Sequence, residues 1–295
     1  IKLVPFGRFG NNIQQLIIAV IIRQLYGIRI FLDEDFESML KSNEFDIFQI
    51  NFLLNNNINN KNTIFIKKVF FFFNEVPTLF TRNYTRSRIN LSPFMILRND
   101  TFLNEKKIFQ NIEKSINKLS PPINKVLESN YDQKLSDSYI NNEVCFLHLR
   151  SGDINNHHLD HFVTNPLSYY LWLRKYFEKL IIITEPGKDH ILLKEIMNIF
   201  NVIYVKRSNQ FIQDFSCIAQ CKNLATSGVS TFPIAAALFN KNLKKIFFSN
   251  IFLKEHLNPN FLNNKVKKYV YDGNDYWRKW FKTDIDKRKN LILES

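Results

Sequence analysis

The second half of the chain alternates short apolar segments with longer segments of helical periodicity, and this alternation restricts the fold more than any other feature. The apolar segments predict strands at residues 144–150, 180–184, 202–205, 223–226 and 244–248. The segments between them predict helices at 166–178, 189–199, 210–221 and 230–239. Strands that alternate with helices of this length form a doubly wound parallel sheet. We therefore predict an α/β, Rossmann-like domain over residues 141–260.

The start of the chain shows a weaker form of the same pattern. Ile1–Phe6 predicts a strand, Gly7–Asn12 a turn, and Ile28–Leu32 a second strand, with apolar residues at helical spacing from Ile13 onward. A glycine turn before a helix brings free backbone N–H groups close to a phosphate or a sugar hydroxyl, although an ordinary structural turn has the same sequence. We expect residues 1–140 to form a second, looser Rossmann-like domain.

A polar stretch separates the two halves. Segment 101–119 places its apolar residues on one side of a predicted helix, and Ser120-Pro121-Pro122 is expected to end that helix. The polar residues from this proline pair to about Asn142 mark the boundary. We predict two domains, 1–140 and 141–260, that face each other across a cleft, followed by a basic aromatic segment at 261–295.

The predicted strand at 144–150 ends in a group of candidate binding residues. They are His148, Arg150 and Asp153. Polar groups at the carboxyl end of a buried parallel strand face the crevice where such sheets bind ligands. Arg150 is therefore a candidate phosphate ligand, and a purely structural arginine is the alternative.

Small and hydroxyl residues open the last predicted helix. Ser227, Gly228, Ser230 and Thr231 stand at the start of this segment. Backbone N–H groups, the helix dipole and side-chain O–H donors at such a helix start can bind an anion. An ordinary serine or threonine helix cap would have the same sequence.

Two groups of residues are candidates for metal binding. Asp33-Glu34-Asp35 could hold a divalent cation, but acids also favour the start of a helix. Cys217 and Cys221 lie one helical turn apart without a second Cys/His pair at ligand spacing, so we expect buried thiols and no metal. With Cys145 the number of cysteines is odd, which is typical of a reducing compartment.

The chain carries a formal charge of +13, which favours an anionic partner. The charge is densest in segment 261–295, where lysines and arginines interleave with tyrosines and tryptophans. This composition suits an anionic membrane surface or a nucleic acid, and a packed C-terminal helix is the alternative. No segment reaches the roughly 18 apolar residues that cross a bilayer.

Three motifs, taken together and in this order, resemble those of the fucosyltransferase superfamily. They are Gly7-Arg8-Phe9-Gly10-Asn11-Asn12, His148-Leu149-Arg150-Ser151-Gly152-Asp153 and Ser227-Gly228-Val229-Ser230-Thr231-Phe232. The first two are similar to the G-R-L-G-N-Q and H-x-R-R-G-D motifs of bacterial α-1,2-fucosyltransferases, and protein O-fucosyltransferases carry related signatures. The resemblance spans roughly residues 3–250. Its clear departure is Ser151, where the bacterial motif has a second arginine.

The resemblance implies a GT-B fold, in which two Rossmann-like domains use GDP-fucose without a metal or another cofactor. It assigns Arg150 to the donor diphosphate and the hydroxyls of Ser230 and Thr231 to the β-phosphate. A bidentate guanidinium suits the first task because it stays charged at every relevant pH.

The same resemblance assigns further residues to the donor. It places His148 and Asp214 near the nucleoside, and Asp153 completes the central motif. Gly10 and Asn11 would face the donor sugar from domain 1–140, the acceptor side.

The implied reaction transfers a deoxysugar to a hydroxyl of a glycan acceptor with inversion. Arg150 and the helix start at 230–231 would stabilise the leaving phosphate. A base near the acceptor hydroxyl would add about 10²–10⁴-fold to the rate. The loop after the central motif offers His157, His158, Asp160 and His161, from which we select His158 and Asp160. A solvated polar loop is the alternative.

We expect an enzyme of the bacterial cytoplasm that builds a cell-surface polysaccharide, with peripheral contact to the inner membrane face through segment 261–295. Its partners would be a nucleotide-sugar donor and a glycan acceptor, and no nucleic acid. One alternative keeps the fold but uses another donor, such as dTDP-rhamnose. Others are a non-catalytic protein that binds an anionic polymer and a lectin-like relic of the family.

Overall fold

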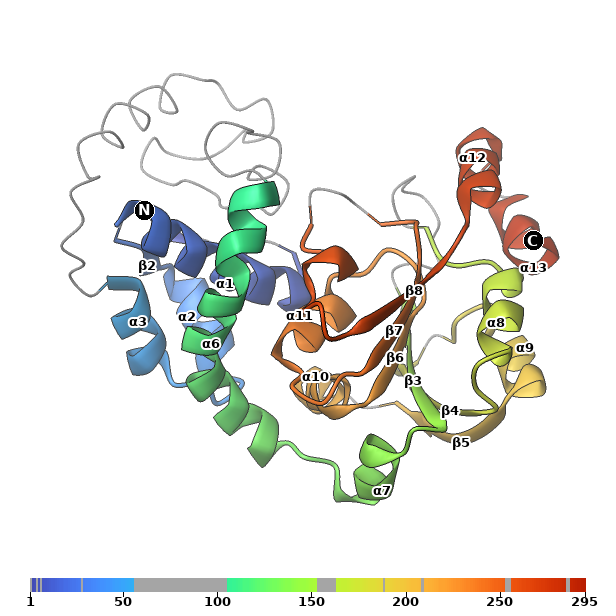
Figure 1. Ribbon diagram of the computed structural model, residues 1–295, viewed down its shortest axis with the longest axis horizontal. Helices are drawn as coiled ribbons and strands as arrows, with labels where there is room; N and C mark the ends of the chain where they lie inside the picture. Colours follow the sequence, from blue (N-terminus) through green and yellow to red (C-terminus); the bar gives the residue numbers. More distant parts are fainter. Residues whose placement is uncertain are drawn as a thin grey trace. The chain divides into compact units, whose positions relative to one another are not determined.

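The computed structural model describes residues 2–3, 5, 7–27, 29–55, 105–152, 163–187, 189–207, 210–252, 256–284 and 287–295 (Figure 1). Contacts divide the chain into two compact units, Ile1–Val126 and Leu127–Ser295, and each is described by itself. Both units contain parallel strands joined through helices, so the fold is α/β.

The second unit is built on a six-stranded, all-parallel sheet with the strand order β5-β4-β3-β6-β7-β8. Its strands are β3 (Val144–Leu149), β4 (Lys179–Thr184), β5 (Asn201–Lys206), β6 (Asn223–Thr226), β7 (Lys245–Ser249) and β8 (Lys267–Tyr271). All of the strands predicted between residues 144 and 248 are present. The chain adds β4 and β5 on one side of β3 and then returns to place β6 on the other side. This reversal is the topological switch point of the sheet.

Helices cover both faces of this sheet (Figure 1). One face carries α8 (Leu167–Arg174), α9 (Leu193–Ile199), α12 (Asn274–Lys282) and α13 (Arg288–Glu294). The other face carries α10 (Phe211–Gln220) and α11 (Phe232–Phe239). All residues of β3 are buried because both of its faces are covered. Its sequence is therefore a continuous apolar run and not an alternating one.

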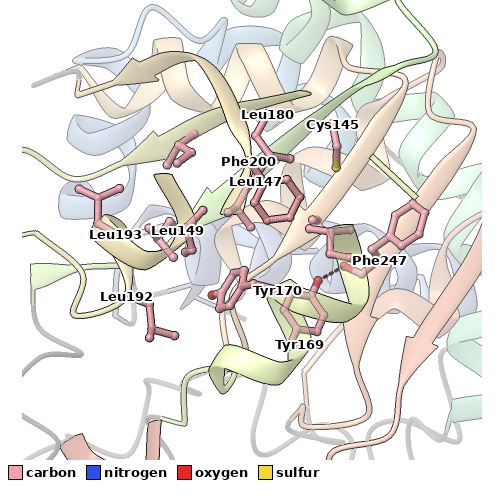
Figure 2. Close-up of a cluster of buried hydrophobic side chains, with 14 of the residues drawn as sticks. Cys145, Leu147, Leu149, Tyr169, Tyr170, Leu180, Leu192, Leu193, Phe200 and Phe247 are labelled. Carbon is pink, nitrogen blue, oxygen red and sulfur yellow. Dashed lines mark hydrogen bonds between the residues drawn. The ribbon is translucent and has the colours of Figure 1, made fainter. Parts of the chain in front are cut away.

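A cluster of buried apolar side chains fills the first face (Figure 2). Leu147 and Leu149 of β3 point into it, since side chains at alternate strand positions share a face. Tyr169 of α8 packs its ring there, and its Oη donates a hydrogen bond to the carbonyl of Phe247 over 2.9 Å. His148, between the two leucines, consequently faces α10 and α11.

The basic aromatic segment 261–295 is part of the second unit. Its strand β8, which the sequence analysis did not predict, pairs with β7 at one edge of the sheet. Tyr276 and Trp280 of α12 are buried in the apolar cluster, and the guanidinium of Arg288 lies 4.8 Å from the centroid of the Trp280 ring. Phe281 of the same helix is 49% exposed. Tyr269, Tyr271 and Trp277 also pack against this cluster, so packing within the unit accounts for five of the aromatic residues in this segment.

The first unit begins with the predicted strand, turn, helix and strand. Its described elements are β1 (Lys2–Leu3), α1 (Phe9–Tyr26), β2 (Phe31–Leu32), α2 (Glu34–Lys41), α3 (Ile47–Asn55) and α6 (Glu105–Ser129). β1 and β2 pair in parallel. α1 begins before the predicted Ile13, so Gly10 and Asn11 lie in its first turn. Among the described helices, none is both long and apolar enough to cross a bilayer.

The predicted end of the helix at Ser120-Pro121-Pro122 is wrong, because α6 continues through both prolines to Ser129. The apolar stripe of this helix does not stop there. Leu119 and Ile123, one turn apart, are both fully buried. Burial along one helix face has overridden the roughly 3 kcal/mol by which an interior proline disfavours a helix. The limit between the two compact units consequently falls inside α6.

Candidate functional site

Charged and polar residues collect at the carboxyl ends of the central strands of the second unit. Arg150 follows β3, Glu185 follows β4, Lys206 ends β5 and Ser227 follows β6. Because these strands are parallel, their carboxyl ends lie at the same edge of the sheet. β3 and β6 are also the two strands that flank the switch point, which is where open α/β sheets bind ligands.

Arg150 is held by the loop that follows β6. Its backbone N–H donates a hydrogen bond to the Ser227 hydroxyl over 2.9 Å, and its Nη1 donates to the Val229 carbonyl over 2.8 Å. The structure therefore brings together two stretches that the sequence analysis had selected separately.

The loop after β6 needs a glycine at position 228. Gly228 has a φ of 117°, which L side chains rarely adopt. A Cβ at this position would lie 2.5 Å from the Val163 carbonyl oxygen and 2.9 Å from the Thr164 Cα. The loop thus runs against the backbone of residues 163–165 at a distance that only glycine allows.

Ser230 and Thr231 lie immediately before α11, which begins at Phe232. Thr231 occupies the N-cap position, but its hydroxyl makes no capping hydrogen bond in the described part of the chain. The ordinary-cap alternative for this threonine therefore does not hold. The first turn of α11 keeps the positive end of its dipole at the edge of the sheet near Arg150, and it offers the N–H group of Phe232 but none from Pro233.

His148 is a buried, neutral imidazole beside Arg150. Burial, followed by the charge of Arg150, lowers its pKa to about 3. Its ring lies 5.4 Å from the ring of Phe232, at the start of α11. Within the described residues its Nδ1 has no hydrogen-bond partner. Buried polar atoms are almost always bonded, so this nitrogen is suited to meet a ligand atom.

Asp214, in the first turn of α10, is a second buried polar group with an open position. Burial raises its pKa to about 7, while Lys206 opposes this rise and Glu185 adds to it. Its Oδ1 has no hydrogen-bond partner among the residues that the structure describes. At neutral pH this carboxyl group can accept or donate a hydrogen bond.

Aromatic contacts connect the surroundings of these two groups. The ring of Phe215, next to Asp214, lies 5.5 Å from the ring of Phe232, which in turn contacts His148. The imidazole and the part of α10 that carries Asp214 thus lie on the same face of the sheet.

Ser151 shows what replaces the second arginine of the bacterial motif. Its side chain is fully buried, accepts a hydrogen bond from the Thr184 hydroxyl over 3.1 Å and donates one to the Glu185 carbonyl over 3.4 Å. Gly152 follows with a φ of 70°, and a Cβ there would meet the Glu185 carboxylate. A small residue fits this place, whereas a guanidinium would have to displace the end of β4.

The remaining predicted site residues lie either outside the described residues or in the first unit. Asp153, His157, His158, Asp160 and His161 lie outside the described residues. Two others, Gly10 and Asn11, belong to the first turn of α1 in the first unit. There the Asn11 side chain lies against Gly7, which has a φ of 70°.

Sequence reasoning missed the polar residues that surround the loop after β6. Thr164, Asn165, His190 and Ser249 are all buried, and each hydrogen-bonds within this region. The only sequence signal was the Thr-Asn-Pro tripeptide directly before α8, which looks like an ordinary helix start.

The metal candidates have structural roles. Asp33 caps α2 by accepting a hydrogen bond from the backbone N–H of Asp35, so the helix-start interpretation is confirmed. Cys145, Cys217 and Cys221 are buried free thiols, as predicted, and burial raises the pKa of Cys217 to about 11. In the described ranges, no group of three or more His, Cys, Asp or Glu residues is arranged to hold a metal ion.

Comparison with known proteins adds no relative: no family model matches this chain, and no curated protein matches it.

Proposed function

We propose that this chain is a glycosyltransferase of GT-B architecture that transfers a deoxysugar, L-fucose from GDP-fucose, to a hydroxyl of a glycan acceptor with inversion. The observation that carries the proposal is Arg150, which is held against the Ser227–Thr231 loop at the switch point of a parallel sheet. A guanidinium beside a helix start, at this place in the fold, suits a nucleoside diphosphate. The three-motif resemblance, which includes Arg150 and the Ser227–Thr231 loop, supports the same conclusion.

The chemistry requires stabilisation of a leaving phosphate. The acceptor oxygen forms a bond to the anomeric carbon while the bond from that carbon to the phosphate oxygen breaks, and the electron pair leaves with the diphosphate. Arg150 and the positive end of the α11 dipole would stabilise this charge without rearrangement, because both are already fixed. The hydroxyls of Ser230 and Thr231 would donate to the β-phosphate. The acceptor proton goes to a base, for which we propose His158 or Asp160.

The open positions of His148 and Asp214 support a nucleoside as the neighbour of the diphosphate. Guanine presents two adjacent N–H donors on one edge, and a carboxylate can accept both. Thymine presents a single N–H between two carbonyl oxygens. A carboxyl group at this place therefore favours GDP over dTDP. Because Ser151 stands where the bacterial motif has a second arginine, only one guanidinium remains, and dTDP-rhamnose stays the alternative donor.

Calorimetric titration with GDP, UDP, dTDP and CMP tests the proposal. We expect selective binding of GDP that persists in the presence of a chelator and is lost in Arg150→Ala. Arg278→Ala is the matched control, because Arg278 is 75% exposed on α12. Selective dTDP binding would preserve the reaction and change the donor. Failure of all four nucleotides to bind would refute the enzyme proposal and favour a protein that binds an anionic polymer.

A further inference from the structure

We propose that Thr164, Asn165 and His190 are positioning residues, which hold the loop after β6 and thereby direct Arg150 toward its ligand. This inference rests on the proposed function for the identity of that ligand, but not for the arrangement of the loop. None of the three residues belongs to a motif selected from the sequence.

His190 has a defined tautomer. Its Nδ1 accepts a hydrogen bond from the backbone N–H of Leu192 over 3.1 Å, so Nδ1 carries no proton. The ring is therefore neutral with its proton on Nε2, which lies 2.8 Å from the Thr164 hydroxyl oxygen. His190 is 2% exposed, and this bond is shielded from water.

The hydrogen bond from His190 determines which group the Thr164 hydroxyl can donate to. Its hydroxyl oxygen accepts from His190 and is left with one proton to donate. That proton goes to the Ser227 carbonyl over 3.0 Å. A threonine that lacked the histidine donor could turn its hydroxyl elsewhere, so the pair fixes the carbonyl more firmly than either residue alone.

Asn165 ties the same loop to two strands. Its backbone N–H donates to the Ser227 carbonyl over 2.9 Å, and its side-chain Nδ2 donates to the Thr226 carbonyl over 2.9 Å. Its Oδ1 accepts from the Ser249 hydroxyl at the end of β7 over 2.6 Å. The loop is consequently held at consecutive carbonyls from one side.

Arg150 contacts other atoms of this loop. It donates to the Ser227 hydroxyl and to the Val229 carbonyl, while the Val229 N–H donates to the Val163 carbonyl over 3.0 Å. Any movement of the loop therefore moves the acceptor of the guanidinium. A preorganised charge stabilises an anion only when it is held at the position that the anion occupies. Residues that fix the Val229 carbonyl therefore control the affinity of this site for an anion.

Three variants test the inference. Thr164→Val removes the hydroxyl and keeps the shape, Thr164→Ser keeps the hydroxyl, and His190→Asn keeps the acceptor for Leu192 but loses the donor to Thr164. Thr283→Val is the matched control, because the Thr283 hydroxyl donates to the Lys279 carbonyl of α12, which is not part of the loop after β6. Calorimetry measures GDP affinity, and amide hydrogen exchange measures the protection of Val229 and Asn165.

We expect Thr164→Val and His190→Asn to bind GDP about tenfold more weakly, the effect of one lost buried hydrogen bond, and to exchange the Val229 amide faster. Thr164→Ser should restore both properties. A Thr164→Val protein with wild-type exchange at Val229 would overturn the inference, whether or not GDP binds. If the wild-type protein binds none of the four nucleotides but the variants exchange the Val229 amide faster, the positioning role stands and the proposed function is refuted.

Discussion

The guanidinium of Arg150 donates a 2.8 Å hydrogen bond to the carbonyl of Val229, a residue that lies 79 positions away in the sequence. This bond joins the strand that supplies the positive charge to the loop that supplies the helix start. It also makes the arginine's position depend on the backbone of that loop.

Arg150→Lys should weaken nucleotide binding nearly as much as Arg150→Ala. A lysine keeps the charge but cannot bond the Val229 carbonyl and a phosphate through a planar fork. Charge-assisted hydrogen bonds contribute about 1.5–3 kcal/mol, so we expect a loss of about 10- to 100-fold in affinity by calorimetry. Binding by Arg150→Lys within about twofold of wild type would show that charge alone is sufficient.

Asp214→Asn should stabilise the protein more at pH 8 than at pH 5. The pKa of Asp214 is raised to about 7 from 3.8, so between these values the native state binds more protons than the unfolded state. Stability contributed by the neutral carboxyl group is therefore lost as pH rises through this range. The upper limit of the gain at pH 8 is about 4 kcal/mol, from urea unfolding at both pH values. Equal effects at the two pH values would contradict the raised pKa.

His148 should act in the opposite direction. Its pKa is lowered to about 3 from 6.5, so the unfolded state binds more protons below pH 6.5 and acid removes stability. His148→Gln should make unfolding free energy less sensitive to pH between 7 and 4. Because Asp214 gains stability over part of the same range, the two effects oppose each other in the wild-type protein. Only the difference between variant and wild type isolates each one.

Gly228→Ala should disrupt the site more than Gly187→Ala. Both glycines have positive φ, with values of 117° and 86°. A Cβ at Gly228 meets backbone atoms, whereas one at Gly187 has no atom of the described chain within 4 Å. We expect a cost of about 1 kcal/mol at Gly187 and about 3 kcal/mol at Gly228, with loss of nucleotide binding only at Gly228. Equal costs in thermal unfolding would mean that the loop can move away from residues 163–165.

Trp280→Ala should cost about 3–5 kcal/mol in unfolding free energy, and Phe281→Ala about 0.5 kcal/mol or less. The first side chain is fully buried and the second is 49% exposed. Deletion of residues 261–295 would remove β8 and open the apolar cluster. Tests of an anionic partner for this segment should therefore replace exposed lysines such as Lys279 and Lys282 individually, with salt-dependent binding as the measurement.

The central strands of the second unit were predictable because each is buried on both faces and reads as a continuous apolar run. β8 was not predictable from the sequence, because Lys-Lys-Tyr-Val-Tyr belongs to an edge strand that is half solvated. The continuation of α6 past Pro121 was hidden for another reason. Local propensity stops a helix at a proline, while the buried stripe through Ile123 depends on what packs against it.

The candidate site was predictable only in its motif residues. Arg150 and Ser227 stand at strand ends that the alternating pattern itself locates. Thr164 and His190 meet through loops that follow different strands, and no spacing in the sequence relates them. The use of a small residue at Ser151 became interpretable only when its burial beneath the end of β4 was known.

The position of β6 beside β3 has a consequence for how the protein folds. The bond from Arg150 to Ser227 spans 77 residues, and β4 and β5 are synthesised in between. A nascent chain can pair β3 with β4, and β4 with β5, early, because those contacts are closer in sequence. At that stage Arg150 is present, but the Ser227–Thr231 loop that it bonds is not. The proposed anion site can therefore assemble only after β4 and β5 have been synthesised, and a nucleotide that binds there would not stabilise an intermediate that lacks β6.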